Sequence, residues 1–289
     1  MPVRSLLATS DLHVTHDGNR SIVDGIRPRT DDDWLIVAGD VAESTDAIAR
    51  TLAMFTDRFA KVIWAPGNHE LWTVGSDPRA RRGAARYDQL VELCRALGVL
   101  TPEDDYPVFD TDDGSFAVAP LFLLYDYSFR DPATSLTDAM DHAYSTGLVF
   151  TDEQLLHPDP FASRQDWCAH RVDVTERRLA AIPTDLRTVL VSHYPLHRGP
   201  TTMLRHPHLA MWCGTDRTAD WHLRFRAEVA VYGHLHIPLT LEYDGVRFEE
   251  VSLGYPREWQ SRKVQPPNPV REILPGDPTR VPWNRRPAG

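Results

Sequence analysis

The sequence predicts a layered α/β domain, and three observations lead to this fold class. Short apolar runs rich in β-branched residues recur along the chain, as in strands that are buried on both faces. Segments with helical spacing of apolar residues lie between the first runs, so that strand and helix alternate. The runs end in polar clusters, and ligands of such domains gather beyond the carboxyl ends of the strands. We therefore expect the functional site at these strand ends.

Five apolar runs are predicted to form strands, at 3–9, 34–38, 61–65, 188–191 and 229–232, and a polar cluster follows each of them. In chain order the clusters contain Asp11 and His13, then Gly39, Asp40 and Glu43, then Gly67, Asn68, His69 and Glu70, then Ser192 and His193, and finally Gly233, His234 and His236. One cluster alone is weak evidence, because such triplets arise often by chance. Together they form a set of oxygen and imidazole donors with one common placement.

The remaining elements are predicted from local patterns. Helical spacing favours helices over 45–59 and 87–97, and the stretch 125–171 has no clear period, so we interpret it as an insertion over the site. A late strand is expected at 246–251, after the hairpin signal Asp244-Gly245. Beyond Gln260 the chain becomes rich in proline. We expect a single domain over 1–260 and a poorly ordered or surface-draped tail over 261–289.

Composition narrows the function classes. The chain has 289 residues and a formal net charge of −10, which argues against a general binder of nucleic-acid backbone. Its three cysteines, Cys94, Cys168 and Cys213, have no paired spacing, as is typical of a reducing compartment. The sequence contains no apolar run of the length that a signal peptide or a membrane span needs. A cytoplasmic protein is the expectation.

With these five clusters in this order, the sequence resembles the calcineurin-like metallophosphoesterases, whose motifs match between residues 11 and 236. The resemblance implies a four-layer fold, in which two mixed β-sheets form a sandwich flanked by α-helices. It also implies two divalent metal ions at the strand ends. Asp11, His13 and His236 would hold the first ion and Asn68, His193 and His234 the second, with Asp40 bridging them.

The residue types suit phosphoryl transfer. Two cations about 3.5–4 Å apart clamp an in-line displacement at phosphorus, and neutral imidazoles keep the pair electropositive toward an incoming phosphate. Nitrogen and oxygen donors suit manganese, iron, zinc or cobalt, and the resemblance favours manganese or an iron-containing pair. His69 corresponds to the family's non-ligand catalytic histidine, which contacts the phosphate and protonates the leaving group. Glu43 and Glu70 are expected to orient imidazoles or backbone amides.

Less specific residues were weighed against ordinary packing. His197 and Arg198 follow His193 closely and are candidate substrate-binding residues, although a solvated loop explains them equally well. Tyr255 and Trp259 follow the last predicted strand and either close one wall of the pocket or bury aromatic area, and we leave them out of the predicted site.

The predicted function is hydrolysis of a phosphate ester by a metal-bound hydroxide at a dinuclear centre. The acidic composition favours a small-molecule phosphomonoester or phosphodiester, such as a nucleotide or a sugar phosphate. A nuclease and a protein phosphatase of the same family are the alternatives. A scaffold without catalysis is disfavoured, because a decayed site would have lost a ligand or the catalytic histidine.

Overall fold

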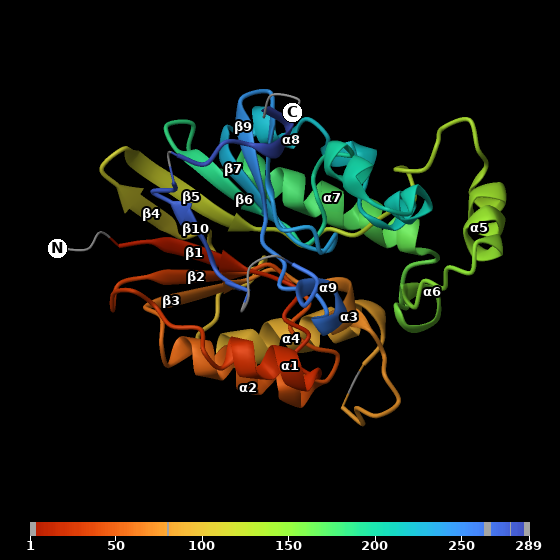
Figure 1. The fold of residues 1–289 in the computed structure, drawn as a ribbon, viewed down its shortest axis with the longest axis horizontal. Coiled ribbons are helices and arrows are strands. Elements are labelled where there is room, and N and C mark those ends of the chain that lie inside the picture. Colours follow the sequence, from red (N-terminus) through yellow and green to blue (C-terminus); the bar gives the residue numbers. More distant parts are fainter. Residues whose placement is uncertain (1–3, 80, 263–266, 278, 286–289) are drawn as a thin grey trace.

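Two β-sheets packed face to face form the centre of the molecule, with helices on both outer faces (Figure 1). The computed structural model describes residues 4–79, 81–262, 267–277 and 279–285. The first sheet has the order β10 (Arg271–Leu274), β1 (Leu6–Thr9), β2 (Trp34–Val37) and β3 (Lys61–Trp64). The second has the order β4 (Val108–Thr111), β5 (Gly114–Pro120), β6 (Arg187–Val191), β7 (Ala227–Tyr232), β9 (Val246–Glu250) and β8 (Thr240–Tyr243). The predicted sandwich of two mixed sheets is confirmed.

Parallel pairing brings the polar clusters to one edge. Strands β1, β2 and β3 run parallel to one another, as do β5, β6, β7 and β9, while β10, β4 and β8 pair antiparallel at the margins. The five predicted strands are confirmed as β1, β2, β3, β6 and β7, except that Val3, the first residue predicted for β1, lies outside the described residues. The late strand is β9, and its hairpin with β8 turns through Asp244 and Gly245, both with positive φ.

Side chains alternate between two cores along the strands, as the pleat requires. Leu6 and Ala8 face the space between the sheets, where they meet Val118 and Val189. Leu7 faces outward, toward the helices.

The helices divide between the two outer faces (Figure 1). The first sheet is covered by α1 (Asp17–Val23), α2 (Thr45–Thr56) and α4 (Gly83–Ala96), and the second by α7 (Arg164–Ala180). The remaining helices are α3 (Asn68–Leu71), α5 (Leu136–Ser145), α6 (Asp152–Leu155), α8 (Trp221–Arg224) and α9 (Pro256–Trp259), with 3-10 turns at Gly199–Met203, Pro207–Trp212, Asp216–Thr218 and Trp283–Arg285. Within the described part of the chain, no helix combines the length and apolarity needed to cross a membrane.

The predicted insertion is more regular than its sequence indicates. It contains α5 and α6, and α7 begins inside it at Arg164. Ser163 is the N-cap of α7, and its side chain accepts a hydrogen bond from the Asp166 N–H. The buried face of α7 includes the polar residues Arg171 and Thr175, so the apolar residues alone do not show a helical period in the sequence.

The predicted tail contains a strand that the sequence analysis did not expect. Strand β10 pairs antiparallel with β1, with Leu274 opposite Leu6, and buries Ile273 and Leu274. This strand is only four residues long and lies among prolines, so the sequence pattern did not indicate it. Residues 263–266, 278 and 286–289 of the predicted tail lie outside the described residues.

Candidate metal centre

The loops after β1, β2, β3, β6 and β7 converge at one edge of the sandwich. They bring together the seven predicted metal ligands, which are Asp11, His13, Asp40, Asn68, His193, His234 and His236. All but the partly exposed His234 and His236 are buried.

The first group of donors consists of Asp11, His13 and His236. The Nε2 atom of His236 lies 3.0 Å from Asp11 Oδ1 and 3.3 Å from His13 Nε2. These three side chains place donor atoms within 4.8 Å of one another, which fits a single metal ion. Two imidazole nitrogens and a carboxylate oxygen directed at one point are suitable for manganese, iron or zinc.

The second group consists of Asn68, His193 and His234. His193 Nε2 lies 3.1 Å from Asn68 Oδ1 and 3.2 Å from His234 Nδ1. The Nδ1 of His193 is 2.9 Å from the Ala38 carbonyl oxygen, which can only accept a hydrogen bond, so Nε2 is left to bind a metal.

Asp40 lies between the two groups. Its Oδ2 is 3.4 Å from His193 Nε2 and 4.0 Å from His13 Nε2. Burial acts to raise the pKa of Asp40, but the His193 and His69 imidazoles beside it hold that pKa well below its usual range. A carboxylate that stays ionised and faces both groups fits a bridging ligand.

The protonation states of two histidines also fit metal binding. Burial, helped by the His69 imidazole, lowers the pKa of His13 to about 3. Burial and the His193 imidazole lower the pKa of His234 to about 3. Both rings are therefore neutral at pH 7 and keep a lone pair for a cation.

His69 borders the centre from the loop after β3. Its Nδ1 lies 2.9 Å from Glu43 Oε1, and its Nε2 lies 3.9 Å from Asp40 Oδ2. The ring stacks on Trp72 at a centroid distance of 3.7 Å. Because Glu43 accepts the Nδ1 proton, the Nε2 atom is the one directed toward the centre. Burial lowers the pKa of His69, but Asp40 and Glu43 outweigh it and raise the pKa overall.

Glu70 holds the loops that carry these side chains. Its carboxylate accepts hydrogen bonds from the backbone N–H groups of Asp40 at 2.8 Å, Val41 at 2.8 Å and Gly67 at 3.0 Å. The contacts of Glu70 with backbone amides and of Glu43 with the His69 imidazole agree with the orienting roles expected of them.

The backbone of the centre is strained. Five of the predicted ligands have positive φ, namely Asp11 (52°), His13 (40°), Asp40 (56°), His234 (67°) and His236 (57°). Each such conformation costs about 1–3 kcal/mol in a residue other than glycine, and it persists only where surrounding contacts enforce it. Backbone hydrogen bonds from Asp11 to Gly39 and from His13 to Asp40 do so here.

Four residues that sequence reasoning missed orient the ligands. Asp11 Oδ2 accepts hydrogen bonds from the hydroxyls of Ser10 and Ser252, each at 2.6 Å. Glu258 Oε2 lies 2.7 Å from His236 Nδ1, and Asp152 Oδ1 accepts a hydrogen bond from the Asn68 amide at 2.9 Å. Ser252 and Glu258 follow β9, which runs parallel to β7, so they lie at the same edge of the sheet as the loop after β7. The predicted late strand could therefore have indicated them. The insertion offered no comparable signal for Asp152.

The family model for calcineurin-like phosphoesterases matches residues 4–238. This chain is a calcineurin-like phosphoesterase. The match confirms the expected enzyme class, a metal-dependent phosphoesterase, and the family's divalent ions agree with the donor cluster.

A similar sequence and a similar crystal structure, both named PptH, come from Mycobacterium tuberculosis. The phosphoesterase is 51% identical over 279 residues to an acyl-carrier-protein phosphodiesterase, PptH, covering 96% of this chain and 85% of that protein. It also matches the crystal structure of the phosphopantetheinyl hydrolase PptH with a TM-score of 0.92 and 51% identity, covering 96% of this chain and 98% of that one.

Two predicted substrate-binding residues of the phosphoesterase are engaged elsewhere. Arg198 donates to the backbone carbonyls of Ser128 and Arg130 and pairs with Asp216 at 3.2 Å. His197 packs against Tyr243 with ring centroids 4.7 Å apart. These contacts argue against the predicted role, because they tie both side chains to the structure outside the donor cluster.

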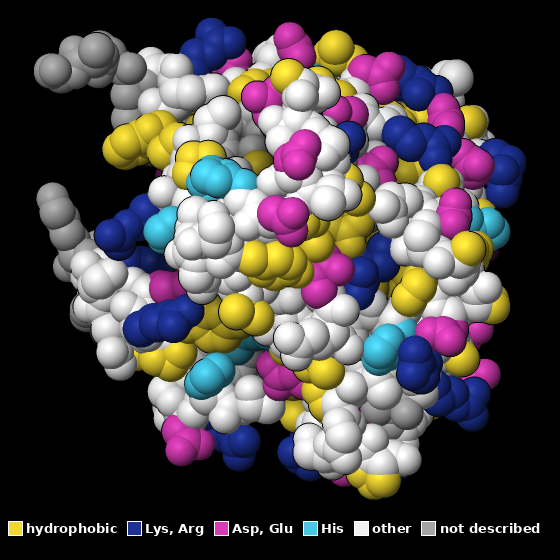
Figure 2. Space-filling view, turned by 90° about the vertical axis from the view of Figure 1, so that its right-hand side faces the viewer, with side chains coloured by type: hydrophobic (Ala, Val, Ile, Leu, Met, Phe, Trp, Pro, Cys, Tyr) yellow, Lys and Arg dark blue, Asp and Glu magenta, His cyan; other side chains and the backbone are white. Residues whose placement is uncertain are grey.

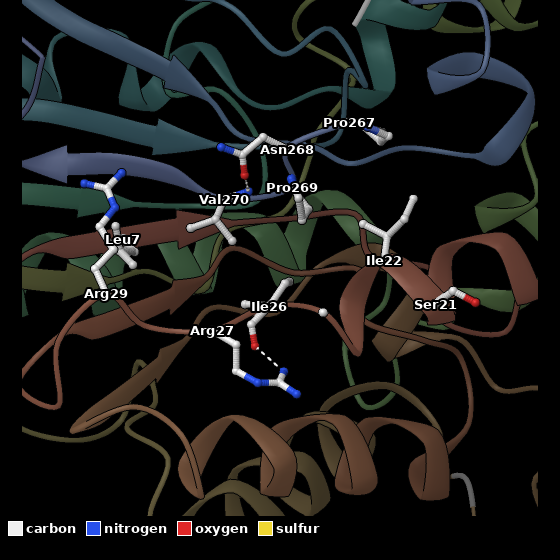
Figure 3. Close-up of a pocket in the computed structure, with 11 residues that line it drawn as sticks. Leu7, Ser21, Ile22, Ile26, Arg27, Arg29, Pro267, Asn268, Pro269 and Val270 are labelled. Atoms are coloured by element: carbon white, nitrogen blue, oxygen red, sulfur yellow. Dashed lines mark hydrogen bonds between the residues drawn. The ribbon is translucent and has the colours of Figure 1, made fainter. Parts of the chain in front are cut away.

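A cavity of about 490 Å³ lies apart from the donor cluster of the phosphoesterase, beside α1 (Figure 3). Its walls are mainly apolar and include Ile22, Ile26 and Val270. Its two arginines already have partners, since Arg27 donates to the Ile26 carbonyl at 2.8 Å and Arg29 pairs with Glu272. Both arginines that line this cavity are therefore already engaged by other groups of the chain.

Proposed function

We propose that this phosphoesterase hydrolyses the phosphodiester that joins a phosphopantetheinyl group to an acyl carrier protein. The observation that carries the proposal is the 51% identity over 96% of the chain to a phosphodiesterase named for this substrate, supported by the TM-score of 0.92. The relative acts on a protein-bound group, so it gives no support to the small nucleotide or sugar phosphate expected from composition. A protein partner replaces the small molecule in the proposal.

For the metal centre, we propose the ligand set that the geometry favours. Asp11, His13 and His236 hold one ion, and Asn68, His193 and His234 hold the other, while Asp40 binds both. Manganese or an iron-containing pair is the proposed occupant, in keeping with the mixed nitrogen and oxygen donors. When bound, the two cations supply an activated water and neutralise charge on the phosphate.

His69 is the proposed general acid. Glu43 fixes its Nδ1 proton, and the Nε2 proton is directed toward the centre, where it can pass to the carrier-protein oxygen that leaves phosphorus. Trp72 stacks on the ring and holds its plane. The carboxylate of Glu43 also stabilises the imidazolium before proton transfer.

The proposal is tested with a carrier protein that carries its phosphopantetheinyl group. The manganese-loaded enzyme is expected to convert this substrate to the apo-protein, which intact-mass spectrometry measures directly. Asp40→Asn serves as the inactive control, because it removes the charge that faces both ion sites. A wild-type enzyme that cleaves aryl phosphate esters but leaves the carrier protein intact would refute the proposed substrate.

The surface gives little support to the nuclease alternative. On the face shown in Figure 2, lysine and arginine side chains are interspersed with aspartate and glutamate rather than gathered in a band. A net charge of −10 agrees with this distribution. Binding to nucleic-acid backbone relies on clustered positive charge.

A further inference from the structure

Tyr255 lies against the candidate metal centre, although the sequence analysis left it out of the predicted site. Its ring stacks on the imidazole of His13, with centroids 4.4 Å apart and planes at 17°. The ring of His236 is 5.0 Å away, edge-on. The Tyr255 hydroxyl lies 3.3 Å from His69 Nε2, the atom proposed to donate a proton. Two proposed ligands and the proposed acid therefore border this one side chain.

The backbone around Tyr255 fixes that position. Leu253 and Gly254 donate to the carbonyls of Ser10 and Asp11 at 2.9 and 3.1 Å, which ties this segment to the end of β1. The Tyr255 N–H donates to Glu258 Oε2 at 2.8 Å, and the same oxygen lies 2.7 Å from His236 Nδ1. Tyr255 is thus held by the contacts that also orient the ligands.

The outer side of Tyr255 remains open. Together with His16, Pro256 and Arg257 it lines a cavity of about 460 Å³. The Arg257 guanidinium lies 5.5 Å from the Tyr255 ring centre, and the His16 ring lies 5.4 Å from it. Tyr255 therefore separates an open cavity from the donor cluster, and a substrate entering from this side meets its ring.

We propose that Tyr255 binds the substrate, donating a hydrogen bond from its hydroxyl to a non-bridging oxygen of the phosphate beside His69. Because the hydroxyl and His69 Nε2 are 3.3 Å apart, a phosphate within reach of one is within reach of the other. A fixed donor directed at developing charge stabilises a transition state strongly. The inference rests on the proposed phosphoester hydrolysis and adds a specific substrate contact to it.

A double-mutant cycle separates this role from an effect transmitted through His69. The variants Tyr255→Phe, His69→Ala and the double variant are compared by kcat/KM on a bis-aryl phosphodiester, whose good leaving group needs no acid. We expect Tyr255→Phe to lower kcat/KM about 10- to 100-fold in both backgrounds. No further loss in the His69→Ala background would show that Tyr255 acts only through His69, and the proposal would fail.

Phosphate binding provides a readout without turnover. Calorimetric titration of the manganese-loaded protein with inorganic phosphate is expected to give about a tenfold higher Kd for Tyr255→Phe. The control Tyr144→Phe, at an exposed position of α5, should leave this Kd unchanged. An unchanged Kd for Tyr255→Phe, or a loss of bound manganese in that variant, overturns the proposal.

The aryl diester used in the double-mutant cycle allows the Tyr255 contact to be tested independently of the proposed carrier-protein substrate. An enzyme that cleaves the aryl diester but leaves a carrier protein intact would refute the proposed substrate and still report on Tyr255. Conversely, cleavage of the carrier protein with an unaffected Tyr255→Phe variant would refute the tyrosine contact alone.

Discussion

At the scale of single residues, the side-chain amide of Asn68 shows how a proposed ligand is oriented by a residue far away in the sequence. The Nδ2 atom of Asn68 donates to Asp152 Oδ1 at 2.9 Å. This hydrogen bond turns the Oδ1 atom of Asn68 toward His193. Asp152 also accepts the indole N–H of Trp72 at 2.6 Å. Only the oxygen of an amide can bind a cation, so the carboxylate selects the useful orientation.

Removing this acceptor is expected to weaken metal binding. Asp152→Ala frees the Asn68 amide to rotate, and we expect manganese affinity to fall about 10- to 100-fold in a calorimetric titration. Asp152→Asn keeps an acceptor oxygen and should lose less. The matched control is Asp141→Ala at an exposed site on α5, and equal affinities for both alanine variants would contradict this role.

At the scale of elements, the loops after β2 and β3 approach so closely that only glycine fits at position 67. A Cβ atom on Gly67 would lie 2.1 Å from Asp40 Oδ1 and 2.6 Å from the Asp40 backbone nitrogen. The absence of a side chain thus allows the proposed bridging carboxylate to meet the loop that carries Asn68 and His69.

Gly67→Ala should therefore disrupt the centre more than the fold. Moving the two loops apart costs about 1–3 kcal/mol of unfolding free energy and displaces Asp40. We expect a lower Tm together with loss of tightly bound manganese, measured by thermal unfolding and metal analysis. Gly75→Ala, where a Cβ would meet open space, should match the wild type in both measurements. Metal content equal to wild type in Gly67→Ala would contradict the argument.

Sequence reasoning succeeded where the local pattern and the tertiary role agree. The five strands that precede the proposed ligands are short, apolar and buried on both faces, so their ends could be located from the sequence alone. It failed for α7, whose buried stripe contains Arg171 and Thr175, and for β10, which is short and lies among prolines. Positive φ at five non-glycine ligands was also beyond prediction, because tertiary hydrogen bonds impose it against local preference.

At the scale of the whole molecule, the second half of the chain completes both the first sheet and the centre. Strand β10 covers the edge of β1, and its Ile273 is fully buried between the sheets. Ser252, Tyr255 and Glu258 reach the centre from the same late part of the sequence. The motif clusters are therefore necessary for the site but do not build it alone.

A charge placed in β10 tests how firmly it is part of the fold. Ile273→Asp buries an unpaired carboxylate, and we expect the free energy of unfolding to fall by more than about 3 kcal/mol in urea titrations. Val281→Asp, at a side chain that is 52% exposed, should change it by less than about 0.5 kcal/mol. Similar small effects of both substitutions would mean that this segment is merely draped over the surface.

The pairing of β1 with β10 also has a consequence for biosynthesis. During synthesis, Leu6 of β1 precedes its partner Leu274 by most of the described sequence. Until then, β1 exposes an unpaired strand edge, which is a site for misassembly with other nascent chains. Ser252 and Glu258, which contact Asp11 and His236, also follow late in the chain. The edge of β1 and the side chains around Asp11 are thus completed only after the chain beyond β9 has been made.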